Sequence, residues 1–165
     1  MLLKIIRYPN PVLRKKCRAI KRIDSKISKL IDDMIETMHE APGVGLAAPQ
    51  VGENIKLIVI DIGEGAFPLI NPKITKKNKT LQTYEEGCLC FPGIVGEVSR
   101  PSEIVVEGQD KKGKKTIIEA QGFLSTVLQH EIDHLEGIVF IDRVKDKTTL
   151  REVQKKEEVE KKELI

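Results

Sequence analysis

Two histidines and a glutamate form the most specific chemical pattern in this sequence. His130 and His134 stand four positions apart, and Glu131 directly follows the first histidine. Residues four apart lie on one face of a helix, so both imidazoles could bind the same metal ion. Glu131 would then lie beside that ion, where a carboxylate can take a proton from water. Because the chain has only 3 histidines, this pairing favours a metal site over a surface helix that carries histidines by chance.

A catalytic site of this kind needs a third protein ligand and leaves one position open for water. A longer metalloprotease pattern would place another histidine at position 140, but Phe140 stands there and cannot bind metal. Two candidates remain. Cys88 offers a thiolate, which is a strong ligand for zinc or ferrous iron, and Gly87 would let the backbone approach closely. Glu152 offers a downstream carboxylate, which would make the chain a zinc endopeptidase.

Cys90 gives an alternative without catalysis, a closed structural zinc site with two cysteines and two histidines. In an extended segment Cys88 and Cys90 would share one face but stand about 6.5 Å apart along it. Two thiolates on one tetrahedral ion usually come from a tighter turn, and the closed site would leave Glu131 without a role. The spacing therefore favours three ligands and an open position.

Two helices are predicted to support this site. The motif helix is expected from about Phe123 to Glu136, with Gly137 ending it in a left-handed conformation. Apolar residues spaced three and four apart between 27 and 38 predict an amphipathic helix, which Asp24 or Ser25 can cap. His39, near the end of that helix, is interpreted as a polar residue on its outer face.

Strands are predicted to fill the middle of the chain. Residues 55–60 form a buried strand, and Leu69–Ile70 belong to another that prolines on both sides interrupt. Residues 104–106 and 116–118 predict a hairpin, and 138–140 a last short strand. Together these elements indicate an α+β fold, with antiparallel or mixed β-sheets packed around the central helix.

Length and composition favour one domain, residues 1–143, followed by a charged tail, 144–165, that is predicted to be a solvated helix. A net charge of +3 gives little support to nucleic-acid binding, and no apolar stretch is long enough for a membrane span. The first residues become charged too early for a secretion signal. An odd number of cysteines, 3, argues for a reducing cytosol, and Cys17 is interpreted as an incidental thiol.

Three separated stretches closely resemble the motifs of the peptide deformylase family. They are Gly43–Gln50, Glu86–Leu89 and Gln129–His134, and the likeness extends over roughly residues 5–143. The first stretch is rich in small and apolar residues, which by themselves indicate either tight packing or substrate contact. One departure is plain, because the family usually has serine where this chain has Cys90.

The resemblance implies a hydrolase that removes the N-formyl group from the first methionine of newly synthesised polypeptides. Cys88, His130 and His134 would bind one divalent ion, with Fe²⁺ expected first and Zn²⁺ as the alternative. A metal-bound hydroxide would attack the formyl carbon, while Glu131 acts as general base and then as general acid. The implied setting is the bacterial cytoplasm, with an organelle as the alternative and the ribosome near its exit tunnel as a further candidate partner.

The resemblance also implies groups that contact the substrate. The Gln50 amide and the Leu89 backbone N–H are expected to stabilise charge on the formyl oxygen. Gly45 is expected to hydrogen-bond the substrate backbone, and Val44 and Arg100 are further candidates for substrate contact.

Helical geometry adds a candidate pocket for the methionine side chain. Phe123, Thr126 and Val127 lie on the face of the motif helix that carries His130. They either line an apolar slot beside the metal, which would accept an unbranched thioether, or pack in the core.

Overall fold

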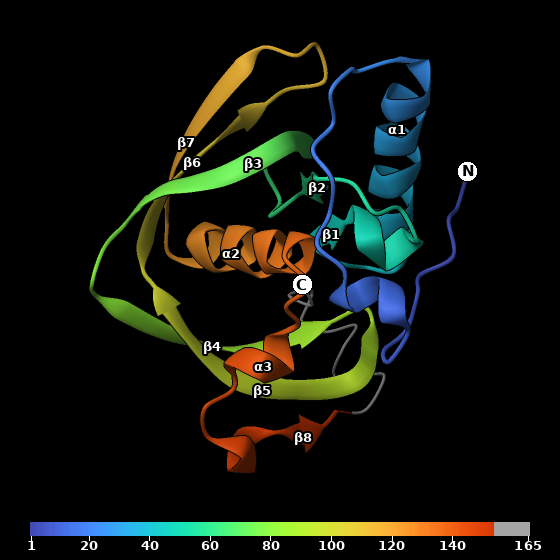
Figure 1. Ribbon diagram of the computed structural model, residues 1–165. Helices are drawn as coiled ribbons and strands as arrows, with labels where there is room; N and C mark the ends of the chain where they lie inside the picture. Colours follow the sequence, from blue (N-terminus) through green and yellow to red (C-terminus); the bar gives the residue numbers. More distant parts are fainter. Residues whose placement is uncertain (154–165) are drawn as a thin grey trace.

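The structure is a computed structural model that describes residues 1–153 of the chain. Two antiparallel sheets lie on either side of one helix, α2, Phe123–Leu135 (Figure 1). The larger sheet has the strand order β1-β2-β3-β6-β7, and the smaller has the order β4-β5-β8. This arrangement confirms the predicted α+β fold around a central helix. The strands are β1 (Gly45–Ala47), β2 (Leu57–Ile60), β3 (Phe67–Lys77), β4 (Leu81–Cys88), β5 (Phe91–Pro101), β6 (Glu103–Gln109), β7 (Lys115–Gln121) and β8 (Arg151–Glu152).

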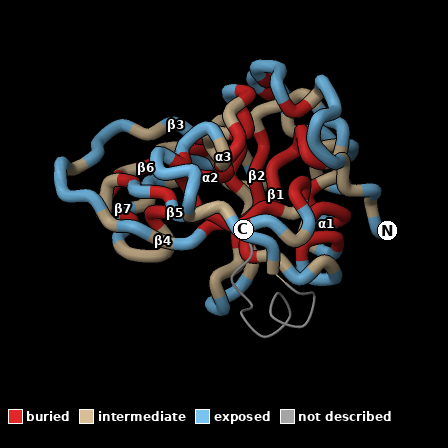
Figure 2. The backbone as a smooth tube through the Cα atoms, turned by 90° about the horizontal axis from the view of Figure 1, so that it is seen from below, coloured by how far each residue is buried: buried red, intermediate tan, exposed pale blue. Residues whose placement is uncertain are grey.

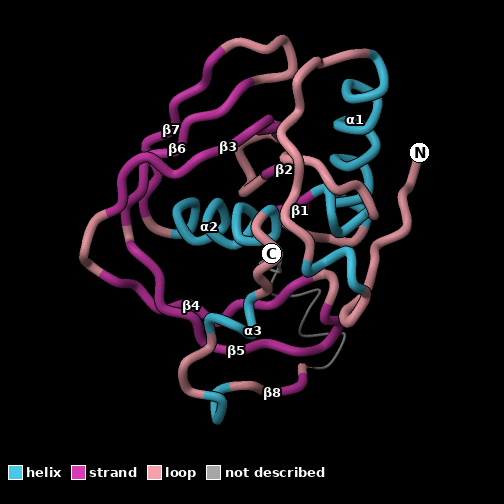
Figure 3. The backbone as a smooth tube through the Cα atoms, viewed as in Figure 1, coloured by secondary structure: helices cyan, strands magenta, loops and turns pink. Residues whose placement is uncertain are grey.

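Helix α2 is enclosed by the rest of the fold, as Figure 3 shows in the same view. It contacts β1, β2 and β7 of the larger sheet and β5 of the smaller one. Nine of its 13 residues are buried, including polar ones. The helix ends where predicted, because Gly137 has a left-handed φ of 76° and a Cβ there would collide with the Arg14 carbonyl.

Helix α1, Ser25–Glu40, confirms the amphipathic helix, and the Asp24 carboxylate accepts from the Ile27 N–H at 3.0 Å. Its apolar face packs against β1 and β2. Figure 2 shows that both of these strands are buried along their whole length. His39 lies on the outer side as expected, and its half-exposed ring bonds Asp61 at 2.8 Å.

The hairpin of β4 and β5 is absent from the elements that the sequence predicted. Its strands pair from Leu81 opposite Pro101 to Gly87 opposite Val95. Along most of β4 exposed residues alternate with half-buried ones, and the side chains include glutamate, glutamine and threonine. A strand of this kind lacks the apolar alternation by which strands are recognised. The hairpin nevertheless supports the site, because β4 ends at Cys88.

Two predictions about strands are wrong. β3 is not interrupted by prolines, since Pro68 pairs opposite Val59 and Pro72 lies within a register shift between Ile70 and Lys73. A bulge tolerates proline because the local ladder is already broken there. Residues 138–140 do not form a strand. Instead the chain turns into a short helix, α3, Phe140–Arg143.

The described part of the tail is not helical. Val144 is buried, and a 3-10 turn at Lys147–Thr149 leads into β8, which pairs with β5. The predicted solvated helix is therefore wrong for these residues, and its remainder, 154–165, lies outside the described residues. Among residues 1–153, no helix has the length and apolar character needed to cross a membrane.

Candidate active site

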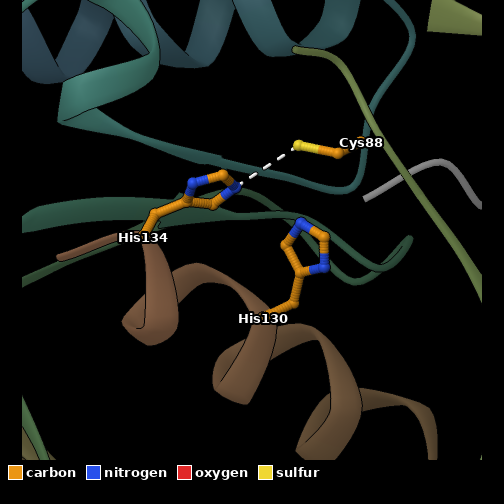
Figure 4. Close-up of side chains that lie close together, drawn as sticks. All are labelled: Cys88, His130 and His134. Atoms are coloured by element: carbon orange, nitrogen blue, oxygen red, sulfur yellow. Dashed lines mark hydrogen bonds between the residues drawn. The ribbon is translucent and has the colours of Figure 1, made fainter. Parts of the chain in front are cut away.

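The end of β4 brings Cys88 close to His130 and His134 of α2 (Figure 4). One ligand atom from each residue lies within 4.8 Å of those of the other two, and all three residues are buried. The Cys88 sulfur is 3.3 Å from Nε2 of His134. The two histidines come from successive turns of the helix, with ring centroids 5.1 Å apart. The grouping shows a donor set that can hold one metal ion.

The chemistry of the donors fits a metal. His130 Nε2 is buried without a hydrogen-bond partner among residues 1–153, as are both carboxylate oxygens of Glu131. Buried polar atoms are normally satisfied, so this cluster points to a ligand and water. Burial, followed by the charges of His130 and Arg100, lowers the pKa of His134 well below its ordinary value. A neutral imidazole is the form that binds metal.

Glu86 holds His130 from behind. Its Oε1 atom lies 2.8 Å from Nδ1 of His130, so the ring can direct Nε2 toward the other ligands. Arg100 donates two hydrogen bonds to the same carboxylate, at 2.7 and 3.0 Å, and a third at 2.8 Å to Asp133. Burial alone would raise the pKa of Glu86, but the hydrogen bonds from His130 and Arg100 outweigh it and lower that pKa.

Glu131 lies against β1, and its Oε1 atom is 4.0 Å from Nε2 of His130. A Cβ atom on Gly45 would lie only 2.6 Å from Oε1 of Glu131, which real contacts do not permit. The glycine therefore makes room for this carboxylate. Burial raises the pKa of Glu131 well above its ordinary value, and the nearby Cys90 and Glu86 add to the effect. A carboxyl group so placed can both accept and return a proton near neutral pH.

Gln50 is fully buried in the short 3-10 helix Ala48–Val51. Its Oε1 accepts from the Ala47 N–H at 2.8 Å, which assigns the amide orientation. Nε2 then points to the ligands and donates to the Cys88 sulfur at 3.3 Å. Leu89 follows Cys88 in the turn after β4, and both residues line a cavity of about 470 Å³.

Cys90 is closer to Cys88 than an extended segment would allow. A turn follows Cys88, which pairs with Phe91, so the two sulfur atoms lie 3.0 Å apart. The predicted separation along a strand is therefore wrong. Cys90 is nevertheless not one of the three residues whose ligand atoms cluster in the described chain.

Other predicted residues lie in different surroundings. Arg100 is 4% exposed, and its three nitrogens are engaged by Glu86 and Asp133, which differs from the expected substrate contact. Val127 is fully buried and Val44 nearly so, both within the main apolar cluster. Phe123 is half-buried at the start of α2.

Glu152 lies on the exposed strand β8 and does not belong to the ligand cluster among residues 1–153. This placement argues against the zinc endopeptidase alternative. Sequence reasoning also gave no role to Glu86 and Asp133. Glu86 precedes the Gly87–Cys88 pair and Asp133 lies within the histidine motif, so their positions were visible, but only the fold brings Arg100 between them.

An α+β fold with a buried thiol, two imidazoles one helical turn apart and an adjacent carboxylate defines a metal-dependent hydrolase. The model of the polypeptide deformylase family matches residues 2–150. The chain therefore belongs to the peptide deformylases, enzymes that remove the formyl group from an N-terminal methionine.

Relatives and solved structures agree. A peptide deformylase from Alkaliphilus metalliredigens is 52% identical over 145 residues, covering 87% of this chain and 98% of that protein. The crystal structure of peptide deformylase from Thermotoga maritima has a TM-score of 0.87 at 40% identity, covering 88% of this chain and 99% of that one. The enzyme from Synechococcus elongatus, solved in complex with actinonin, has a TM-score of 0.86 at 39% identity, covering 99% and 87%. Neither the endopeptidase nor the structural zinc site is supported.

Proposed function

We propose that Cys88, His130 and His134 hold one divalent ion and that Glu131 moves the protons of the deformylation reaction. The observation that carries this assignment is a buried carboxylate whose two oxygens have no hydrogen-bond partner among residues 1–153, beside three clustered ligand atoms. A bound ion would supply Lewis acidity, which would polarise the formyl carbonyl and lower the pKa of water. The protein must supply everything else, namely proton transfer, orientation and the exclusion of bulk solvent.

Glu131 is assigned both proton transfers. One carboxylate oxygen accepts a proton from the attacking water, and the same group returns it to the leaving amine nitrogen. The lack of hydrogen-bond partners in the described chain leaves its oxygens available for this exchange. Because Gly45 has no side chain, the carboxylate can lie directly against the backbone of β1.

Gln50 and Leu89 are assigned to the formyl oxygen, where negative charge develops. The Gln50 Nε2 donor is fixed by the hydrogen bond on the other side of its amide, so it is oriented before the substrate arrives. A donor placed in advance stabilises the transition state without reorganisation, and losing one typically costs about 3 kcal/mol. We assign the Leu89 backbone N–H as the second donor, and Gly45 and Val44 to the substrate backbone.

Iron is proposed as the metal, with zinc as the alternative. Two imidazoles and a thiolate suit both Fe²⁺ and Zn²⁺, so the preference for iron comes from the family resemblance. Anaerobic purification followed by metal analysis would decide between them. A preparation that contains zinc alone and is fully active would contradict the preference for iron.

We assign the methionine side chain of the substrate to a slot beside Phe123, while the fully buried Val127 contributes to the wall behind it. Arg100 is reassigned as a positioning residue that acts through Glu86. Phe123→Ala is expected to lower kcat/KM for formyl-methionyl peptides about tenfold relative to formyl-alanyl peptides. An unchanged ratio would contradict this assignment.

The setting follows from the substrate. Formyl-methionyl chains are nascent polypeptides, and the relatives are bacterial proteins such as that of Alkaliphilus metalliredigens. We therefore propose that the enzyme works in the bacterial cytoplasm, near the ribosomal exit tunnel. Co-sedimentation of the full chain with translating ribosomes tests the ribosome proposal, and absence of binding at low salt would contradict it.

The decisive assay measures formate released from formyl-Met-Ala-Ser by protein loaded with ferrous iron without air. The native chain should release formate, while Cys88→Ala should lose both metal and activity. Glu152→Gln should be fully active, because this carboxylate lies on β8 outside the ligand cluster of the described chain. Metal binding that survives Cys88→Ala would contradict the ligand assignment.

A further inference from the structure

Cys88 has a second thiol beside it that the deformylase mechanism does not use. The sulfur atoms of Cys88 and Cys90 are 3.0 Å apart, and both residues are almost wholly buried. The structure contains three free cysteines, and Cys17 belongs to a different apolar cluster from the other two. The adjacent pair therefore forms a distinct chemical group within the described residues.

The fold holds both cysteines in place. Cys88 ends β4 and receives contacts from Gln50 Nε2 and His134 Nε2, each at 3.3 Å from its sulfur. The backbone carbonyl of Cys90 accepts a hydrogen bond from the Tyr8 N–H at 3.0 Å. With only Leu89 between them, the sulfurs need a small approach to reach bonding distance, which is about 2.05 Å.

A small oxidant can reach this pair. The cavity of about 470 Å³ has Cys88 and Leu89 in its lining, together with Phe91 and Pro92. Water must reach this site for hydrolysis to occur. Hydrogen peroxide is little larger than water and can therefore reach it as well. Cys88 is therefore the sulfur that an incoming oxidant meets first.

We propose that Cys88 and Cys90 form an oxidative modification site, at which a peroxide converts the two thiols into a disulfide. The Cys88 sulfur attacks one peroxide oxygen, so an S–O bond forms, the O–O bond breaks and one water leaves. The Cys90 sulfur then attacks the oxidised sulfur. An S–S bond forms, the S–O bond breaks, and a second water carries away the remaining thiol proton. The two sulfurs lose two electrons, which reduce the peroxide to water.

The disulfide has two consequences. A disulfide sulfur cannot serve as a thiolate ligand, so the metal should leave, which rests on the proposed ligand role of Cys88. The disulfide also protects Cys88, because a lone thiol continues to sulfinic and sulfonic acids that thiol reagents do not reduce. The second cysteine thus turns an irreversible loss into one that a dithiol can repair.

The test uses the full chain loaded with Zn²⁺, which has no redox chemistry of its own. The protein is treated with hydrogen peroxide, zinc release is followed with a chromogenic chelator, and free thiols are alkylated under denaturing conditions for peptide mapping. We expect one peptide containing both Cys88 and Cys90 to lose two hydrogen atoms as zinc is released. Dithiothreitol should restore the thiols and, on addition of Zn²⁺, the original stoichiometry.

Cys90→Ser is the matched control, since serine is similar in size. This variant should release zinc under the same treatment, but its Cys88 should gain oxygen atoms and dithiothreitol should not restore binding. Cys17→Ser should behave like the native chain. The proposal is overturned if Cys90 remains alkylatable in oxidised native protein, or if Cys90→Ser recovers as fully as the native chain. Peptide mapping reports the disulfide independently of zinc, so it separates this proposal from the ligand assignment.

Discussion

Two buried glutamates at the site have opposite surroundings. Glu86, from β4, and Glu131, on the helix itself, both have no exposed surface. Glu86 is paired with Arg100 and His130 and has a lowered pKa. Glu131 has no hydrogen-bond partner in the described chain and has a raised pKa.

These surroundings suit the two residues to different tasks. An ionised, fully paired carboxylate is suited to orienting a ligand imidazole and is poorly suited to exchanging protons. An unpaired carboxyl group in an apolar environment is costly to stability and well suited to proton transfer. The side of α2 that faces β4 and β5 therefore builds the site, and the side that faces β1 performs chemistry there.

Glu131→Gln should reduce catalysis strongly while leaving the fold intact. Removing a general acid and base should lower kcat by roughly 10²- to 10⁴-fold. The free energy of unfolding should change by less than about 1 kcal/mol, because within residues 1–153 the carboxylate has no hydrogen bond to lose. Formate release and urea unfolding of the metal-loaded chain measure the two quantities. A stability loss as large as that of a Glu86 variant would show that the two carboxylates are not opposites.

Glu86→Ala should show the reverse pattern. Arg100 would remain buried with one acidic partner fewer, and breaking a buried ion pair costs about 3–5 kcal/mol of unfolding free energy. Metal affinity should fall about 10- to 100-fold, because His130 loses the group that orients its ring. Urea unfolding and metal competition against a chelator check both values. Glu86→Gln, which can still accept from His130, should recover part of the metal affinity, and no such recovery would argue against the orienting role.

The parts of the site that lie on one helix were predictable from the sequence, and the arrangement of β4 and β5 was not. His130, Glu131 and His134 lie on one helix, where a fixed helical period brings residues four apart together. The sequence therefore predicted both this helix and its glycine end, Gly137, correctly. The spacing of these three residues depends only on the local geometry of the helix, whereas their contacts with Glu86 and Gly45 do not.

The β4 side required long-range information. The hairpin is rich in polar residues, and Glu86 meets Arg100 only because the strand register brings them to one face. Cys88 was identified from its residue type, whereas its closeness to Cys90 depends on a turn that period-two reasoning cannot give. Arg100 was predicted to contact substrate, and its charge alone could not indicate that Glu86 and Asp133 would accept hydrogen bonds from its side chain.

Gly45→Ala tests whether the position of the Glu131 carboxylate matters, without changing any charge. Its Cβ would lie 2.6 Å from Glu131 Oε1 and would displace that carboxylate. A misplacement of about 1 Å can cost roughly 10²-fold in kcat. Gly96→Ala is the control, since its Cβ would crowd the Leu150 side chain at 2.7 Å, outside the cluster of ligand residues. Gly96→Ala should lower the free energy of unfolding but leave kcat unchanged. Equal losses of kcat in the two variants would argue against a specific effect of Gly45→Ala on Glu131.

Asp133→Asn removes one of the two acidic partners of Arg100 and should change the protein only slightly. Asp133 accepts from Arg100 at 2.8 Å and from Arg143 at 3.0 Å, and the exposed fraction of its side chain is 14%. Because Glu86 still holds Arg100 from the other side, the unfolding free energy should fall by only about 1–2 kcal/mol. Metal affinity and kcat should stay unchanged, because the contact between Glu86 and His130 remains. A loss of metal affinity equal to that of Glu86→Ala would mean that Asp133 takes part in orienting His130, and that the support of the site extends to the surface of the molecule.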